Sequence, residues 1–193
     1  MIILTDIDGV CANFVQAFTE NAYNRTGIEV DKVIHYDIFN HYPPRTHDEL
    51  NYMVASPGFC YNIPVLDGAV EGIRALQQLG EVYAVTSPWK SDTWMVERQE
   101  WVIKHLNIPA NNIIHTHAKH LIRGDILIED RIENLSSWHK AWPQGTPILL
   151  NQSYNAHMDT PAGILRAYSW ENILSTLRVT IAKQMRGPSD FKC

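Results

Sequence analysis

Short apolar segments recur along the chain and predict strands that are buried on both faces. Continuous apolar runs, unlike alternating ones, are typical of a parallel sheet covered by helices. The predicted strands are Ile2 to Thr5, Val82 to Thr86, Ile113 to His115, Ile126 to Ile128 and Ile148 to Leu150, with Leu165 to Tyr168 as a sixth. Between them, apolar residues follow helical spacing over Gly68 to Leu79, Asp92 to Leu106 (with Ser91 as its N-cap), Ile132 to Trp142 and Trp170 to Met185. This alternation predicts an α/β fold with a doubly wound, Rossmann-like parallel sheet.

One segment interrupts the alternation. From about residue 12 to residue 66 no strand pattern is found, although Cys11 to Arg25 and His47 to Ala55 favour helices. Aromatic, histidine and proline residues fill the stretch between these two helices. We therefore expect a helical insertion at 12–66 above an α/β core made of 1–11 and 67–186, followed by a loose tail at 187–193.

Composition and charge limit the class of protein. Of the 193 residues, 45% are hydrophobic and 19% charged, a balance that suits one globular domain with a modest insertion. The net charge of −5 provides no basic field for a nucleic-acid polymer, so an anionic substrate must be held by local cations. The three cysteines are scattered and predict reduced thiols. With neither a leader peptide nor an apolar run of about 20 residues, the chain is expected to be soluble and cytoplasmic, without a membrane partner.

The first predicted strand runs into two aspartates, Asp6 and Asp8, followed by Gly9. In an open α/β sheet, ligands bind at the carboxyl ends of the strands. One carboxylate there can attack as a nucleophile while the other transfers a proton, and both favour a hard cation such as Mg²⁺. A calcium-binding loop is the competing interpretation. It would need a Glu where the chain has Ala17, and a helix where a strand precedes Asp6.

Hydroxyl and ammonium groups follow the next two strands. Thr86 and Ser87 can hydrogen-bond a phosphate oxygen, although such residues after a strand often only form a turn or a cap. Lys119 follows the third strand, where its ammonium group could balance the charges of a nucleophile and a phosphate. Taken alone, a lysine at that place is more often a solvated surface residue.

Two adjacent acids, Glu129 and Asp130, follow the fourth strand. An acidic pair at such a place is costly unless water or a cation balances it. With Asp6 and Asp8 the pair forms a cluster of four carboxylates, and this cluster predicts bound Mg²⁺.

The order of these motifs resembles that of the haloacid dehalogenase-like phosphatases, and the insertion occupies the position of their helical C1-type cap. Within that superfamily the chain is similar to the 5'(3')-deoxyribonucleotidases of the cytosolic type C 5'-nucleotidase family. The similarity extends from Met1 to about Leu177 and is poorest over Gly27 to Ser56. It is carried by Asp6 to Phe14, Pro57 to Phe59, Pro64 with Gly68 and Ala69, Thr86 to Pro88, Trp101 to Leu106, Lys119 with Gly124 to Asp130, and Ser169 with Trp170.

The resemblance implies a mechanism. Asp6 would attack phosphorus to form an aspartyl-phosphate, while Asp8 would protonate the departing nucleoside oxygen and then take a proton from water. Mg²⁺ would contact Asp6, the carbonyl group of Asp8, and the acidic pair. The family commonly has two aspartates where this chain has Glu129 and Asp130, so we favour Asp130 for direct contact, with Glu129 acting directly or through water.

The resemblance also implies the substrate contacts. The phosphoryl oxygens would be held by Thr86, Ser87, Lys119 and Lys90. Phe14 and Phe59 correspond to aromatic positions of the family's nucleoside pocket, whereas taken alone they would more often be core residues. Some family members have an arginine where this chain has His117. The expected substrate is a nucleoside monophosphate, and a homodimer is left open.

Other interpretations remain at this point. A related phosphatase could act on another small ester such as a sugar phosphate, because the segment expected to set selectivity is where the similarity fades. A catalytically silent ligand-binding module could share the fold. The run containing His115, His117 and His120 could hold a transition metal, although a solvated loop is the simpler interpretation. A dinucleotide-binding enzyme is disfavoured because no GxGxxG follows the first strand.

Overall fold

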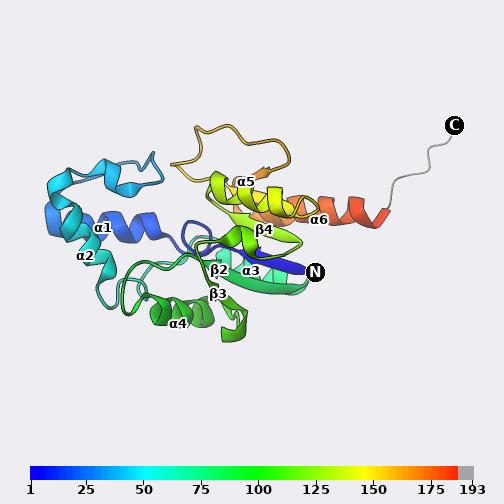
Figure 1. Cartoon of the computed structure of the whole chain (residues 1–193), viewed down its shortest axis with the longest axis horizontal. Helices are drawn as coiled ribbons and strands as arrows, with labels where there is room; N and C mark the ends of the chain where they lie inside the picture. The colour runs from blue at the N-terminus through cyan, green and yellow to red at the C-terminus, as the bar shows by residue number, and fades with distance from the viewer. Residues whose placement is uncertain (187–193) are drawn as a thin grey trace.

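A single six-stranded parallel sheet forms the centre of the molecule, and the fold class predicted from the sequence is confirmed (Figure 1). The computed structural model describes the backbone of residues 1–186 and the side chains of residues 1–180. The strand order is β3-β2-β1-β4-β5-β6. The strands are β1 (Ile2–Thr5), β2 (Glu81–Thr86), β3 (Ile113–His115), β4 (Ile126–Glu129), β5 (Thr146–Leu150) and β6 (Leu165–Ala167). The order reverses direction between β1 and β4, which is where a doubly wound sheet opens a crevice at its carboxyl edge.

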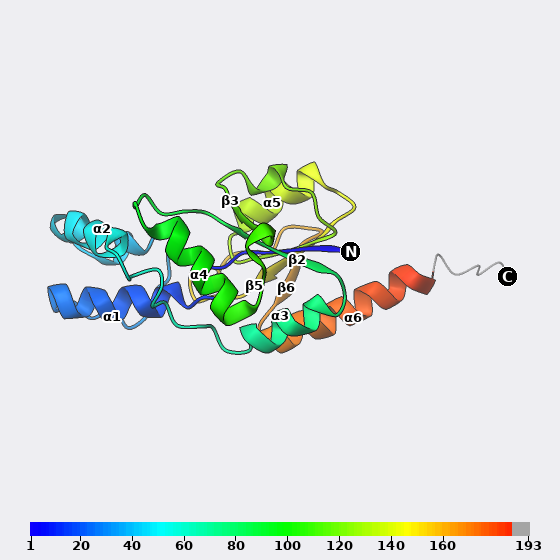
Figure 2. The ribbon, with the colours of Figure 1, turned by 90° about the horizontal axis from the view of Figure 1, so that it is seen from below.

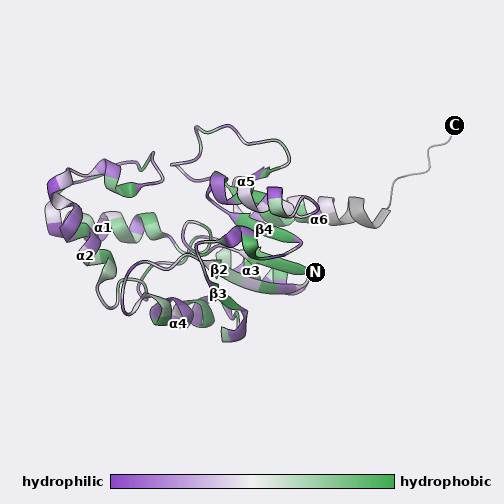
Figure 3. Cartoon of the chain, viewed as in Figure 1, coloured by the Kyte–Doolittle hydropathy of each residue, from purple (hydrophilic) through white to green (hydrophobic). Residues whose placement is uncertain are grey.

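Helices cover both faces of the sheet, which explains why its central strands are mostly apolar (Figures 2 and 3). Alternate strand residues enter two separate cores, with Ile3 and Ile128 on one face and Leu4 and Leu127 on the other. The first core includes buried residues of α3, α4 and α6, and the second includes buried residues of α5. These helices are α3 (Ala69–Gln77), α4 (Trp94–Leu106), α5 (Ile132–Ala141) and α6 (Trp170–Arg186).

The segment 12–66 lies beyond the carboxyl ends of the strands and contains helices and turns, without a strand (Figure 1). Its two connections to the sheet run side by side, because Asn13 donates its backbone N–H to Pro64 (2.7 Å) and Leu66 donates to Cys11 (2.7 Å). The elements are α1 (Phe14–Thr26), the 3₁₀ turns η1 (Ile38–His41) and η2 (Pro44–Thr46), and α2 (His47–Ala55). Two further 3₁₀ turns lie near β3, namely η3 (Ala110–Asn112) and η4 (Lys119–Leu121).

Two predicted helix starts are wrong by two or three residues. The first helix begins at Phe14 and not at Cys11, because residues 11–13 are engaged with the returning connection and the Asn13 side chain caps the helix. The helix predicted from Asp92 begins at Trp94, with Thr93 as its N-cap residue. Ser91 does not cap it. Its hydroxyl instead donates to the carbonyl oxygen of Ala55 (2.7 Å), so it ties this loop to the end of α2.

Other sequence expectations concern thiols, membranes and the tail. Cys11 and Cys60 are both buried and free of disulfide bonds, whereas Cys193 lies outside the described residues. No helix of the described chain has the length and apolar character needed to cross a membrane. The tail at 187–193 also lies outside the described residues.

Candidate active site

A pocket of about 510 Å³ opens between the carboxyl edge of the sheet and the segment 12–66. Its floor is charged and its upper wall is aromatic. The floor residues are Asp6, Asp8, Lys119 and Asp130, and the aromatic wall comprises Phe14, Phe39, Trp89 and Trp94. All four floor residues were predicted from the sequence, at three separate strand ends, and the parallel sheet brings them together because its carboxyl ends share one edge.

Asp6 is the first residue after β1 and is 6% exposed. Its Oδ1 accepts the backbone N–H of Ile7 (2.7 Å), and its Oδ2 lies 2.7 Å from Nζ of Lys119. Burial and, second to it, the charge of Glu129 raise the pKa of Asp6 to about 7, against the opposing effect of the Lys119 charge. Near neutral pH, Asp6 therefore exchanges between its protonated and ionised forms, and additional positive charge nearby would favour the ionised form.

Lys119 is buried, so the alternative interpretation that it is a solvated surface residue is wrong. Its Nζ lies 2.7 Å from both Asp6 and Glu129. Burial by itself lowers the pKa of Lys119, but the two carboxylates outweigh burial and raise the pKa above its ordinary value. Lys119 is thus a fixed cation beside Asp6.

Glu129 and Asp130 are adjacent but differently engaged. Both oxygens of Glu129 already accept hydrogen bonds, Oε1 from the N–H groups of Asp130 and Arg131, and Oε2 from Lys119 and Asn134. Glu129 therefore holds Lys119 and the following turn in position. Asp130 in contrast has one oxygen, Oδ1, that is buried without a hydrogen-bond partner among the described residues.

The carboxylates fit a divalent cation. Oxygen atoms of Asp6, Glu129 and Asp130 lie within 4.8 Å of one another, and the described residues contain no other such group of His, Cys, Asp and Glu. The unpartnered Oδ1 of Asp130 is buried, where an oxygen without a partner is costly. Burial raises the pKa of Asp130 to about 6, a shift that a bound cation would reverse. The histidine run at 115–120 forms no comparable cluster within the described residues.

Tyr154 and Asn155 fix Asp130 from the loop after β5. The hydroxyl of Tyr154 donates to Oδ2 of Asp130, and the Asn155 amide donates to the backbone oxygen of Asp130 (2.8 Å). A Cβ atom at Gly9 would overlap both Asp130 Oδ2 and the Tyr154 hydroxyl, and Gly9 also has a positive φ of 73°. Only glycine therefore allows the Asp8–Gly9 turn to approach this carboxylate so closely.

Asp8 points one oxygen at an arginine that the sequence did not reveal. Nη2 of Arg98, on α4, donates to Oδ1 of Asp8 (2.5 Å), and the arginine is fully buried while the Asp8 side chain is 26% exposed. Burial raises the pKa of Asp8, and the Arg98 charge opposes this effect. Asp8 lines the pocket beside Asp6, so the predicted proton donor and the predicted nucleophile border the same space.

The aromatic wall is a continuous stack. Trp89 stacks against Phe14 (ring centroids 6.2 Å apart, planes at 29°) and against Phe39 (6.1 Å, 21°). Phe59 does not line the pocket and instead packs behind the wall, stacked on Trp94 (6.3 Å). The predicted contact of Phe59 with substrate is therefore indirect in this geometry. Trp89 directly follows Ser87 and Pro88 in the sequence, so its place next to a predicted phosphate-binding motif was the signal that could have identified it as a pocket residue.

The remaining predicted residues lie around the pocket at different depths. Ser87 lines it, and its hydroxyl donates to the Thr116 carbonyl (3.1 Å). Thr86 is buried just beneath, with a hydroxyl that has no partner within the described residues. Lys90 lines a shallower hollow beside the pocket, together with Trp89 and His117. His117, at the position where some family members have arginine, lines both.

Comparisons with known proteins agree with this geometry. A Bordetella bronchiseptica protein that carries a provisional 5'(3')-deoxyribonucleotidase name is 31% identical over 184 residues, covering 91% of this chain and 96% of its own. The human 5'(3')-deoxyribonucleotidase, cytosolic type, is 25% identical over 181 residues, covering 88% and 89%. The solved structure of a haloacid dehalogenase-like family hydrolase from Streptococcus pneumoniae superposes with a TM-score of 0.58 at 10% identity, covering 91% and 97%.

The parallel sheet, with an aspartate pair after its first strand, a lysine after its third and an acidic pair after its fourth, defines a haloacid dehalogenase-like phosphatase. Residues 1–185 match the family described as 5' nucleotidase, deoxy (pyrimidine), cytosolic type C protein. The chain belongs to this family of 5'-nucleotidases.

Proposed function

We propose that the protein is a Mg²⁺-dependent deoxyribonucleotidase that hydrolyses deoxynucleoside monophosphates to nucleoside and phosphate through an aspartyl-phosphate on Asp6. The observation that carries the proposal is one pocket with a buried ionic floor and a stacked aromatic wall. A nucleotide presents the matching pair of surfaces, an anionic phosphate and a flat base. Base–aromatic stacking contributes about 1–3 kcal/mol for each base.

The roles of the floor residues follow from their contacts. Asp6 attacks phosphorus, and Lys119 stabilises the negative charge of Asp6 and of the phosphoryl oxygens. The hydroxyl of Thr86, without a partner among the described residues, supports a hydrogen bond to those oxygens, and the Ser87 hydroxyl would join by turning away from the Thr116 carbonyl. Asp8 donates a proton to the departing nucleoside oxygen and later accepts one from water. Lys90 would join only if its side chain reached over from the neighbouring hollow.

Asp6, the backbone carbonyl group of Asp8, and Asp130 would hold Mg²⁺, with Glu129 acting through its hold on Lys119 and on the turn. When bound, the ion neutralises repulsion between the nucleophile and the substrate phosphate. The segment 12–66 would act as the cap, because it supplies Phe14 and Phe39 to the wall over the sheet. Cytoplasmic location and a homodimer remain predictions.

Mg²⁺ should stabilise the folded protein as well as activate it. Removing divalent ions with EDTA should stop phosphate release, and Mg²⁺ should restore it better than the larger Ca²⁺. At ten times its Kd, Mg²⁺ should stabilise the fold by about 1.4 kcal/mol and raise Tm by roughly 3–6 °C. Asp130→Asn should lose most of this Tm shift, measured by differential scanning fluorimetry. A fully active metal-free preparation would contradict the proposal.

The decisive experiment compares substrates under matched conditions. With Mg²⁺, dUMP or dTMP should be hydrolysed faster than UMP, on the order of 10²-fold in kcat/KM, because an apolar wall leaves a 2'-hydroxyl without a partner. Sugar phosphates such as glucose 6-phosphate should be poorer still, because they offer no flat aromatic base to stack on the wall. A preference for a sugar phosphate would overturn the nucleotide assignment and leave the aspartate chemistry standing. Phosphate binding without release from any ester would instead indicate a silent binding module.

A further inference from the structure

A fully buried arginine contacts one of the two catalytic aspartates, and none of the predicted motifs includes it. Arg98 lies on α4, and its only ion pair within the described residues joins Nη2 to Oδ1 of Asp8 (2.5 Å). Its guanidinium carbon lies 5.3 Å from the ring centroid of Trp94 and 5.6 Å from that of Trp101. The side chain is therefore held between two indole rings with one donor directed at Asp8.

This arrangement is costly for stability alone. Nε and Nη1 of Arg98 are buried and have no hydrogen-bond partner among the described residues, and the contacts with the Trp94 and Trp101 rings offset only part of that loss. Replacing a buried ion pair by apolar residues of similar volume is often neutral or stabilising. Packing therefore does not explain the arginine, whereas its bond to Asp8 does.

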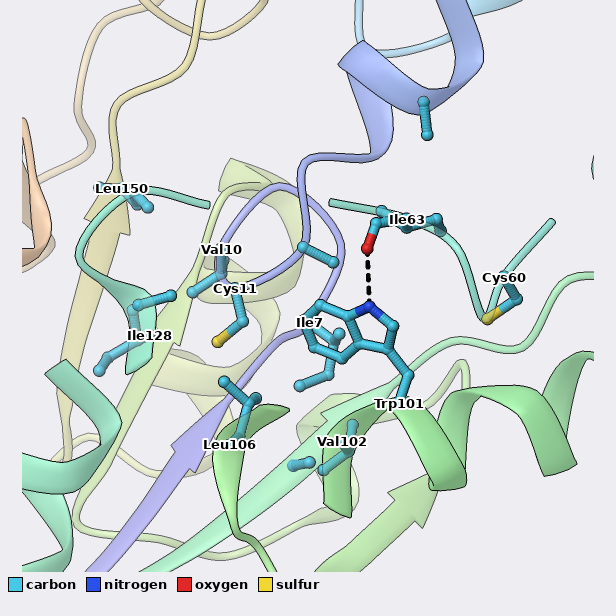
Figure 4. Packing of buried hydrophobic residues seen from close by; sticks show 14 of the residues in the cluster. Ile7, Val10, Cys11, Cys60, Ile63, Trp101, Val102, Leu106, Ile128 and Leu150 are labelled. Carbon is cyan, nitrogen blue, oxygen red and sulfur yellow. Dashed lines mark hydrogen bonds between the residues drawn. The ribbon is translucent and has the colours of Figure 1, made fainter. Parts of the chain in front are cut away.

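Hydrogen bonds to a neighbouring segment hold helix α4 in place, so the position of Arg98 relative to Asp8 is fixed. The carboxylate of Glu97 accepts the backbone N–H groups of Gly58 (2.8 Å) and Tyr61 (3.1 Å). The indole N–H of Trp101 donates to the carbonyl oxygen of Ile63 (2.7 Å), close to Ile7 (Figure 4). The helix that carries Arg98 is thus bonded to the connection by which the segment 12–66 returns to the sheet.

We propose that Arg98 is a positioning residue that fixes which oxygen of Asp8 delivers the proton to the leaving group, an inference that rests on the proposed function. A guanidinium group has donors and no acceptor, so while it binds Oδ1 the acidic proton of Asp8 is carried by Oδ2. In the first half-reaction an Asp6 oxygen bonds to phosphorus and the bond from phosphorus to the nucleoside oxygen breaks. The electron pair of that bond stays on the nucleoside oxygen, which takes the proton from Oδ2 and leaves Asp8 as a carboxylate.

The test uses two leaving groups with different needs for a proton. A nucleoside alkoxide requires protonation as it departs, whereas p-nitrophenolate departs readily without it. In single-turnover experiments with Mg²⁺, Arg98→Met should slow nucleoside release from dUMP by about 10–100-fold, as expected for a misdirected catalytic group. Release of p-nitrophenolate from p-nitrophenyl phosphate should stay within about threefold of wild type. Arg98→Lys keeps the positive charge without the planar guanidinium group. It should also slow nucleoside release more than p-nitrophenolate release, but by a smaller factor than Arg98→Met.

A matched control separates positioning from general damage. Val102 is also buried on α4 and belongs to the core, so Val102→Ala should lower Tm and affect both leaving groups equally. Equal slowing of both leaving groups in Arg98→Met, as in this control, would overturn the inference.

A double-mutant cycle provides the second measurement, and it also covers the case in which Arg98→Met alone fails to fold. In an Asp8→Asn background, adding Arg98→Lys should change nucleoside release by less than about twofold, because the group it positions is already gone. A further large loss would show that Arg98 acts elsewhere. If the wild-type protein released neither leaving group, the proposed function would be wrong. If the wild-type protein were active but the Arg98 variants slowed both leaving groups equally, only the inference about Arg98 would be wrong.

Discussion

Asp6→Asn protein should fold normally and lose phosphate release by about 10⁴-fold or more. The amide is nearly isosteric, and its oxygen can still accept the backbone N–H of Ile7, but it is a poor nucleophile. Burial and Glu129 already disfavour the ionised form of Asp6, and Lys119 keeps Glu129 as its partner, so losing the contact between Asp6 and Lys119 should lower stability only modestly. The measurements are phosphate release from dUMP with Mg²⁺, and Tm of the metal-free protein.

Two further variants complete this experiment. Asp8→Asn should lower the rate of phosphate release less, by about 10²–10⁴-fold, because it removes the general acid and base while the nucleophile remains. Asp67→Asn alters an exposed carboxylate near α3, away from the pocket, and should keep wild-type activity. If folded Asp6→Asn protein released phosphate at a near-normal rate, the aspartyl-phosphate mechanism would be wrong.

The sheet and the pocket floor could be predicted because their physical requirements are local in the sequence. Strands that are buried on both faces must be apolar throughout, so β1, β2 and β4 were visible as short runs of such residues. Parallel strands place their following residues at one edge, so Asp6 and Lys119 were expected together, although they are far apart in the sequence.

Arg98, Tyr154 and the wall tryptophans left weaker signals. Arg98 follows Glu97 and precedes Gln99 and Glu100, a polar run that is typical of a solvated helix face. Yet Arg98 stands four residues after Trp94 and three before Trp101, so helical spacing places it on the apolar stripe of α4, and this was the signal that could have revealed its burial. Tyr154 belongs to the loop after β5, and loops carry no repeating pattern from which a side-chain direction can be read.

The different contacts of the two adjacent acids, Glu129 and Asp130, could not be predicted from the sequence. The sequence alone gives no physical ground for preferring Asp130 over Glu129 as the direct metal contact, a preference that rests on the family resemblance. Successive residues at a strand end, however, face different sides. Glu129 turns to Lys119 and to Asn134 of α5, whereas Asp130 turns to Tyr154 of the loop after β5. The longer side chain thus accepts four hydrogen bonds, whereas one oxygen of the shorter side chain has no partner among the described residues.

Lys119→Met should both inactivate the protein and destabilise it, by about 3–5 kcal/mol. Removing one partner of a buried ion pair leaves an uncompensated charge, and here the single ammonium serves both Asp6 and Glu129 at 2.7 Å. The free energy of unfolding should be measured by urea denaturation without Mg²⁺, and activity by phosphate release with Mg²⁺.

A second substitution separates these two losses. Glu129→Gln in the Lys119→Met background removes the buried negative charge that lost its partner, while the amide oxygen can still accept the N–H groups of Asp130 and Arg131. The double variant should therefore regain much of the lost stability. Activity should stay low, because no cation then stands beside Asp6 to stabilise the attacking and transferred charges. If the double variant regained activity together with stability, Lys119 would be a structural counterion of the acidic cluster and would have no part in the chemistry.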